Sequence, residues 1–178
     1  MTLLLKKILL FLLLAFVSQV AVIGQSMLFT RYTEEEGLPS PLVKSIATGH
    51  NGIVWAATDE GLVRFDGRDF RLFSDELPGI YAKSVLALPD GRILVTTDMG
   101  VARVTDKAGL VQFETIARGS VKQNDSTMWY PKMLFSDAAG RVWLSDNFRI
   151  FRYTEKGFKS YVPGLGVATN NFNRSFSF

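Results

Sequence analysis

Residues 43–65 read VKSIATGHNGIVWAATDEGLVRF, and the same pattern returns twice further along the chain. Residues 82–104 read AKSVLALPDGRILVTTDMGVARV, and residues 131–153 read PKMLFSDAAGRVWLSDNFRIFRY. A glycine at the tenth position of each copy, Gly52, Gly91 or Gly140, recurs after 39 and then 49 residues. Self-similarity at such a period is the mark of a repeat architecture, so one structural unit is expected three times.

Each copy carries the signals of β-strands. Short runs rich in β-branched and aromatic residues, such as IVWAA after Gly52, alternate with turn residues. The pairs Asn51-Gly52, Asp66-Gly67 and Asp90-Gly91 predict tight type I′ hairpin turns. In the first copy the expected strands cover residues 44–49, 53–58, 62–66 and 69–74. No segment after the leader keeps a 3.6-residue hydrophobic period, so little helix is expected.

Four antiparallel strands per copy predict an all-β fold, a partial β-propeller, because a lone sheet cannot cover both of its apolar faces. Trp55, Leu94 and Trp143 share one strand position and are expected between blades. The glycines expected in the turns of the repeat are Gly52, Gly61, Gly91, Gly100 and Gly140. The expected blades cover residues 37–75, 76–116 and 127–162, and residues 170–178 start a further one.

Residues 29–33 resemble the outermost strand of a blade but have no blade of their own. Such a strand would complete the last blade of a ring and remove its exposed edge. Neither that last blade nor the rest of the blade begun at residue 170 is in the sequence. The chain is therefore expected to be part of a longer protein, with the remaining blades as its first partners.

Residues 1–24 have the features of a signal peptide. Lys6 and Lys7 precede ten apolar residues, and small or polar residues follow up to Gly24. An uncleaved membrane anchor is the alternative, although the apolar stretch is shorter than the roughly 20 residues of a typical span. Export without any cysteine suits a bacterial periplasm.

Composition excludes several functions. Lys6 and Lys7 supply two units of the formal net charge of +3, so no nucleic-acid surface is expected. The chain has no cysteine and one histidine, His50, which excludes thiolate sites and metal sites built from several histidines. No cofactor, metal site or catalytic residue is expected.

The repeats resemble the two-component regulator propeller family. The resemblance rests on YTEEEGLPS at 32–40, VKSI at 43–46, GIVW at 52–55, ATDEGL at 57–62 and RFDG at 64–67. It implies the periplasmic sensor region of a hybrid two-component histidine kinase, which detects an oligosaccharide or another small extracellular ligand. It also implies attachment to the inner membrane through a later part of the protein, and a homodimer is compatible with it.

Loops at one end of the ring are the expected ligand site. The insertion at residues 122–130 combines polar groups with aromatic rings that could stack on a sugar. Its candidate residues are Asn124, Asp125, Trp129 and Tyr130, and neighbouring loops add Glu35 and Asp75. Alternatively, Trp129 and Tyr130 open the first strand of their copy and pack in the core, since they align with Tyr81 of the preceding copy.

A basic residue also recurs once per copy, as Lys44, Lys83, Lys132 and Arg174. A ring of cations could receive an anionic ligand, or the side chains could bond loop carbonyls and acidic turns. A propeller lyase or glycosidase and a protein-binding scaffold are the alternative functions. An enzyme would need converging acid and base groups, which no motif of the sequence supplies.

Overall fold

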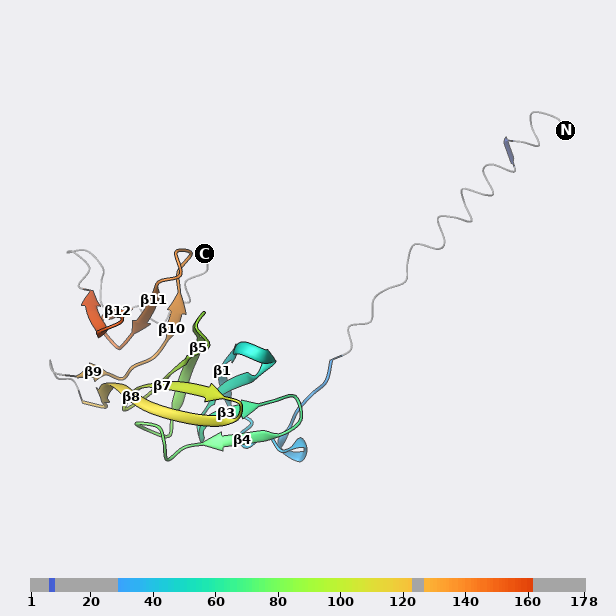
Figure 1. Cartoon of the computed structure of the whole chain (residues 1–178), viewed down its shortest axis with the longest axis horizontal. Coiled ribbons are helices and arrows are strands. Elements are labelled where there is room, and N and C mark those ends of the chain that lie inside the picture. Colours follow the sequence, from blue (N-terminus) through green and yellow to red (C-terminus); the bar gives the residue numbers. More distant parts are fainter. Residues whose placement is uncertain (1–6, 9–28, 123–126, 162–178) are drawn as a thin grey trace. The chain divides into compact units, whose positions relative to one another are not determined.

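Strands alternating with short turns build three mainly antiparallel sheets in the part of the chain from Tyr32 onward (Figure 1). The computed structural model describes residues 7–8, 29–122 and 127–161. Residues up to Arg31 form a separate unit. Within 29–122 and 127–161, helix is confined to two 3₁₀ turns, η1 (Glu34–Glu36) and η2 (His50–Gly52).

The sheets follow the chain order, and we call them blades 1, 2 and 3. Blade 1 contains β1 (Val43–Thr48), β2 (Val54–Thr58), β3 (Gly61–Phe65) and β4 (Phe70–Phe73). Blade 2 contains β5 (Ala82–Ala87), β6 (Ile93–Thr97), β7 (Gly100–Lys107), β8 (Leu110–Ser120) and the short β9 (Met128–Trp129). Blade 3 contains β10 (Leu134–Ser136), β11 (Val142–Ser145), β12 (Ile150–Thr154) and β13 (Gly157–Tyr161).

Strand register places the repeated residues at equivalent points. Trp55 pairs with Arg64, Leu94 with Arg103 and Trp143 with Arg152, each between the second and third strands of a blade. The first strands β1, β5 and β10 lie together, with β5 in contact with both others. The chain is therefore a partial β-propeller, as the sequence predicts.

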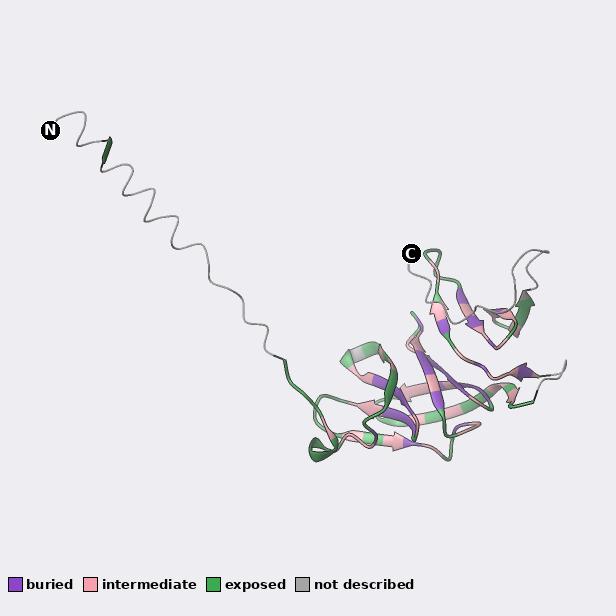
Figure 2. Ribbon diagram, turned by 180° about the vertical axis from the view of Figure 1, so that it is seen from behind, coloured by how far each residue is buried: buried purple, intermediate pink, exposed green. Residues whose placement is uncertain are grey.

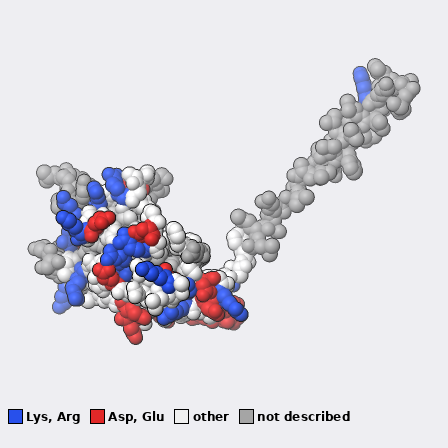
Figure 3. All heavy atoms as spheres, viewed as in Figure 1, with Lys and Arg blue, Asp and Glu red and all other residues white. Residues whose placement is uncertain are grey.

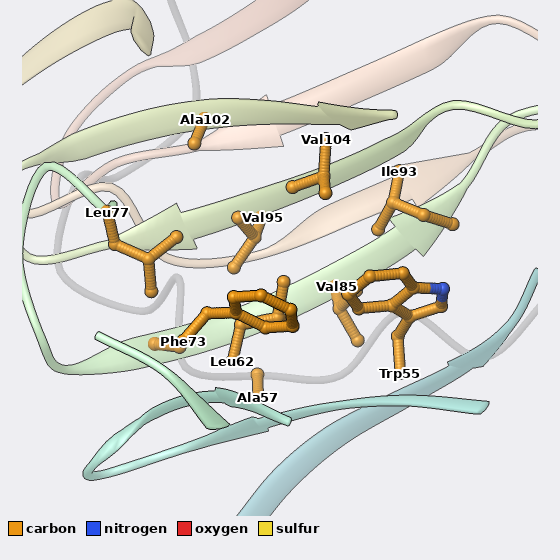
Figure 4. Close-up of a cluster of buried hydrophobic side chains, with 11 residues drawn as sticks. Trp55, Ala57, Leu62, Phe73, Leu77, Val85, Ile93, Val95, Ala102 and Val104 are labelled. Carbon is orange, nitrogen blue, oxygen red and sulfur yellow. The ribbon is translucent and has the colours of Figure 1, made fainter. Parts of the chain in front are cut away.

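The hydrophobic core lies between the blades. In Figure 4, Trp55 and Phe73 of blade 1 point toward Val85, Ile93 and Val95 of blade 2. A second cluster joins Leu94 and Val101 of blade 2 to Leu134, Leu144 and Phe151 of blade 3. The buried residues accordingly concentrate in inner strands such as β2, β3 and β6, whereas β1 and β8 have only intermediate and exposed residues (Figure 2).

Trp143 differs from the two residues that share its position. Trp55 and Leu94 are buried at 1% and 0% exposure, whereas Trp143 stays partly exposed. Its neighbours Val142 and Leu144 face blade 2, so Trp143 lies on the opposite face of blade 3. The residues expected to start a further blade there, 170–178, lie outside the described residues.

The hairpin loops correct the predicted turn type. Type I′ needs a positive φ at both central residues, but only the glycine has one, at 76° in Gly52 and 86° in Gly91. In the second copy, the Leu88 N–H donates to Arg92 O and the Gly91 N–H to Leu88 O. The loop therefore has three residues, a type I turn followed by a left-handed glycine.

The second turn of blades 1 and 2 depends on threonine and glycine. The Thr58 hydroxyl donates to Gly61 O and accepts from the Glu60 N–H, and Thr97 repeats this arrangement. Gly61 has a φ of 137°, and a Cβ there would lie 2.3 Å from Phe73 O. Any other residue at position 61 would therefore push β4 away from β3.

Some expected boundaries shift. β8 continues to Ser120, and β9 pairs with it in parallel, so Met128 and Trp129 belong to the sheet of blade 2 and not to blade 3. Residues 29–33 are not in a strand, and the last blade expected to pair with them is not among the described residues. Of the expected signal peptide, only Lys7 and Ile8 are described. Across the described ranges, no helix is long and apolar enough to cross a membrane.

Candidate functional site

The first strands of blades 1 and 2, together with residues 132–134 at the start of blade 3, line an open cavity of about 620 Å³, which we call the axial cavity. It is lined by Lys44, Ser45, Lys83, Ser84, Lys132, Met133 and Leu134. The recurring lysines of the sequence therefore converge on one space. On the face shown in Figure 3, by contrast, basic and acidic side chains are intermixed.

An irregularity in the strand pairing places the first lysine of blades 1 and 2 in the cavity. The β1–β2 register shifts between Val43 and Ser45, and the β5–β6 register shifts between Ala82 and Ser84. Each shift leaves the intervening lysine outside the ladder, where it lines the cavity.

The serine beside each lysine holds the next blade. The Ser45 hydroxyl oxygen accepts from the Val85 N–H at 3.2 Å, and that of Ser84 accepts from the Leu134 N–H at 3.1 Å. The Thr96 hydroxyl adds a 2.6 Å bond to Lys132 O. The first strands are thus tied to one another around the cavity.

The three lysines have unequal partners. Lys44 forms an ion pair with Asp59 of the β2–β3 turn. Lys83 has the equivalent Asp98 nearby, but its ammonium lies 4.0 Å from the centre of the Tyr130 ring and forms no ion pair among the described residues. The β2–β3 and β11–β12 registers place Thr58 and Asp146 at equivalent positions. Asn147 therefore occupies in blade 3 the position that Asp59 occupies in blade 1. Lys132 has no carboxylate within ion-pair distance in the described part of the chain.

Burial changes the acidity of Lys83. The pKa of its ammonium is lowered to about 8, mainly by desolvation; the charge of Asp98 opposes this change, and the positive charges of Lys132 and Lys44 contribute to it. One buried oxygen of Asp98, Oδ1, has no hydrogen-bond partner among the described residues. The Asp98 carboxylate therefore balances Lys83 only from a distance.

The insertion is anchored by an aspartate that sequence reasoning missed. The side chain of Asp146 is fully buried, and its carboxylate accepts from the N–H groups of Trp129, Phe148 and Arg149. Arg149 pairs with it at 2.9 Å and also donates to Thr127 O at 2.7 Å. This network holds the end of the insertion against the β11–β12 turn.

Trp129 and Tyr130 are partly buried and belong to neither hydrophobic core cluster. The Trp129 ring stacks on Phe148 with 4.4 Å between centroids, and its Nε1 donates to Val121 O. Tyr130 has a φ of 53°, unusual for a non-glycine residue. Asn124 and Asp125 lie outside the described residues.

Glu35 and Asp75 are not brought to the axial cavity. Glu35 is exposed in η1, where the Thr33 side chain accepts its N–H. Asp75 is exposed after β4, and its carboxylate accepts from the Ser74 hydroxyl at 3.3 Å. No contact joins the two carboxylates in the described part of the chain.

One feature of the sequence could have pointed to Asp146 and Arg149. The third copy has Asp146-Asn147-Phe148-Arg149 where the others have Thr-Asp-x-Gly, and this is the copy that follows the insertion. The departure marks the turn that receives Trp129. In the described ranges, no three His, Asp or Glu side chains form a group that could hold a metal ion.

No family model and no curated protein matches the chain. Solved structures do. The extracellular domain of the putative hybrid two component system BT3049 from B. thetaiotaomicron has 21% identity and a TM-score of 0.61, over 74% of this chain and 20% of that one. The corresponding domain of BT4673 has 22% identity and a TM-score of 0.53, over 67% and 16%.

Virginiamycin B lyase from Staphylococcus aureus is a third similar structure, with 18% identity and a TM-score of 0.51 over 68% of this chain and 41% of the lyase. At these identities the likeness shows the propeller fold. This chain spans about a fifth of the length of the BT3049 domain.

Proposed function

We propose that the chain forms part of an exported β-propeller that recognises an oligosaccharide, or a similar extracellular ligand, for a two-component signalling receptor. The repeat resembles the regulator propeller family, and two extracellular domains of hybrid two component systems share the fold. In this proposal the chain acts on the periplasmic side of the inner membrane, and ligand binding changes how the propellers pack, in a homodimer or with the remaining blades.

One contact carries the proposal. The Lys83 ammonium over the Tyr130 ring brings the aromatic insertion next to the axial cavity. The contact supports treating two features that the sequence predicts separately, a stacking surface and a ring of cations, as parts of one proposed site. Aromatic rings beside convergent polar groups are typical of sites for small polar ligands.

The site also has a rigid aromatic element. Asp146 holds the Trp129 backbone, and Phe148 supports one face of its ring. A ring fixed in this way loses little conformational freedom when a ligand stacks on it, which favours binding. Trp129 is the residue that we expect to contact a sugar.

Calorimetric titration of the full chain with xylotriose, maltotriose and trigalacturonate tests the proposal. We expect at least one to bind, and Trp129→Ala to weaken that binding about tenfold, the loss of one stacking contact. Trp143→Ala, which removes a partly exposed tryptophan from β11, is the matched control and should leave binding unchanged.

Circular dichroism should show the same β-sheet content in both variants. If none of the three saccharides binds, or if the two substitutions act equally, this ligand class is wrong. Chromatography of the incubated mixtures tests the alternative of a lyase or glycosidase, for which cleaved saccharide would be decisive.

A further inference from the structure

We infer that the axial cavity is an anion site, in which Lys83 and Lys132 hold a carboxylate, sulfate or phosphate group. The inference deepens the proposed function and rests on it where the anionic group belongs to the recognised saccharide. The same chemistry would also hold a free inorganic anion. The experiment below separates the two sources.

Charge balance is the first argument. Three ammonium groups line the cavity, but among the carboxylates of the described residues only Asp59 forms an ion pair with one of them, Lys44. Asp98 acts on Lys83 from a distance, and Asn147 replaces the third carboxylate. Cations that converge in a partly desolvated space repel one another, and an anion between them removes that cost.

The available donors are the second argument. The backbone uses the acceptor side of the Ser84 hydroxyl, because the Leu134 N–H donates to it. The Ser84 hydroxyl and the ammonium groups of Lys83 and Lys132 donate to no acceptor among the described residues. Charge-assisted hydrogen bonds from such donors to an oxyanion are short and strong.

The surroundings of Lys83 predict how binding depends on pH. The groups that face it are Asp98 from the β6–β7 turn, Lys44 from β1, Lys132 before β10, and the Tyr130 ring. With its pKa lowered to about 8, Lys83 is charged below that pH and neutral above it. Affinity for the anion should therefore fall as the pH rises through about 8.

The test is calorimetric titration of the full chain at low ionic strength with sodium sulfate, galacturonate and galactose. We expect sulfate and galacturonate to bind at least about tenfold more tightly than galactose, which lacks the charge. Added sodium chloride should weaken both anions. Sulfate reports a free anion, and galacturonate reports a charged sugar.

The variants Lys83→Met and Lys132→Met should each weaken anion binding about tenfold, the loss of one charged hydrogen bond. Lys159→Met removes an exposed lysine of β13, outside the cavity, and should have no effect. Lys83→Arg retains the charge and should retain binding. If Lys83→Met does not fold, anion binding by Lys132→Met, and by the unchanged chain at pH values on either side of about 8, still tests the anion site.

Equal affinity for galactose and galacturonate would overturn the anion site while leaving saccharide recognition intact. Anion binding that is the same in Lys132→Met and Lys159→Met would overturn it as well. Sulfate binding that needs Lys132 in a chain that binds none of the saccharides would support the anion site with a free anion as its source, and would contradict the proposed ligand class.

Discussion

The equivalent faces of blades 1 and 3 have matching residues in different surroundings. Trp55 is 1% exposed against blade 2, whereas Trp143 at the same register position is partly exposed. Arg64 bonds to Asp106 of blade 2, whereas Arg152 is exposed. Position alone therefore does not bury a side chain, because the neighbouring sheet completes the core.

The comparison shows that each blade supplies half of two cores. The same is seen at β1, whose face turned away from blade 2 leaves Ile46 at 68% exposure. In the ring predicted from the sequence, a further blade would cover Trp143 and the closing blade would cover Ile46. The predictions below use substitutions at matched positions to test this difference.

The largest effect is expected for Trp55→Ala. It should lower the free energy of unfolding by about 3–5 kcal/mol, because it leaves a cavity between two packed sheets. Trp143→Ala should cost less than about 2 kcal/mol, because its side chain already contacts solvent. Urea unfolding of the full chain measures both. Similar losses would show that Trp143 is covered as well as Trp55 is.

A second comparison sets the turn of blade 3 against that of blade 1. Asp146→Ala should cost about 3 kcal/mol, because it leaves Arg149 and three N–H groups without their buried acceptor. Asp59→Ala removes only the more exposed pair with Lys44 and should cost less than about 1 kcal/mol. The same unfolding measurement applies, and equal costs would mean that Asp146 does not anchor the insertion.

Substitutions of the equivalent arginines Arg64 and Arg152 should differ by a smaller amount in their effect on the free energy of unfolding. Arg64→Met breaks a 2.7 Å bond between its Nε and Asp106 and should cost about 1–2 kcal/mol. Arg152→Met should change the stability by no more than about 0.5 kcal/mol, as for an exposed position. Hydrogen exchange of β3 and β12 amides would locate the loss, and faster exchange in both strands would contradict the difference.

The parts of the fold that depend on local pattern could be predicted from the sequence. Alternating apolar residues and recurring glycines mark the strands, and the expected range 53–58 lies within one residue of β2. The type I′ prediction was wrong because Asn51-Gly52 has the residues of a two-residue loop, whereas the Gly49 N–H closes a longer loop on Ile53 O. That bond depends on where the ladder ends, which the pair itself does not reveal.

The candidate site was harder to predict because its contacts join distant residues. Composition drew attention to Trp129 and Tyr130, and recurrence drew attention to the lysines. Nothing in the sequence showed that Lys83 would lie on Tyr130 or that Asp146 would hold Trp129. Those contacts arise from the stacking of blades, and the parallel pairing of β9 with β8 moves the insertion toward blade 2.

The smallest expected effect is on the stability of the folded chain at acidic pH. The Trp143 indole N–H donates to Asp137 at 2.9 Å and, with Arg141, lowers the pKa of that carboxyl to about 2. A carboxyl whose pKa is lowered by folding stabilises the folded chain above its usual pKa, and this contribution is lost as the pH falls toward about 2. Trp143→Phe keeps the ring but removes the donor, so the pKa of Asp137 should rise and acid unfolding should begin at a higher pH. Carbon-detected NMR titration of Asp137, with Asp90 beside Arg92 as the unaffected control, measures the change. An unchanged midpoint would show that the Ala139 N–H and the two donors of Arg141 hold the Asp137 carboxylate without help from Trp143.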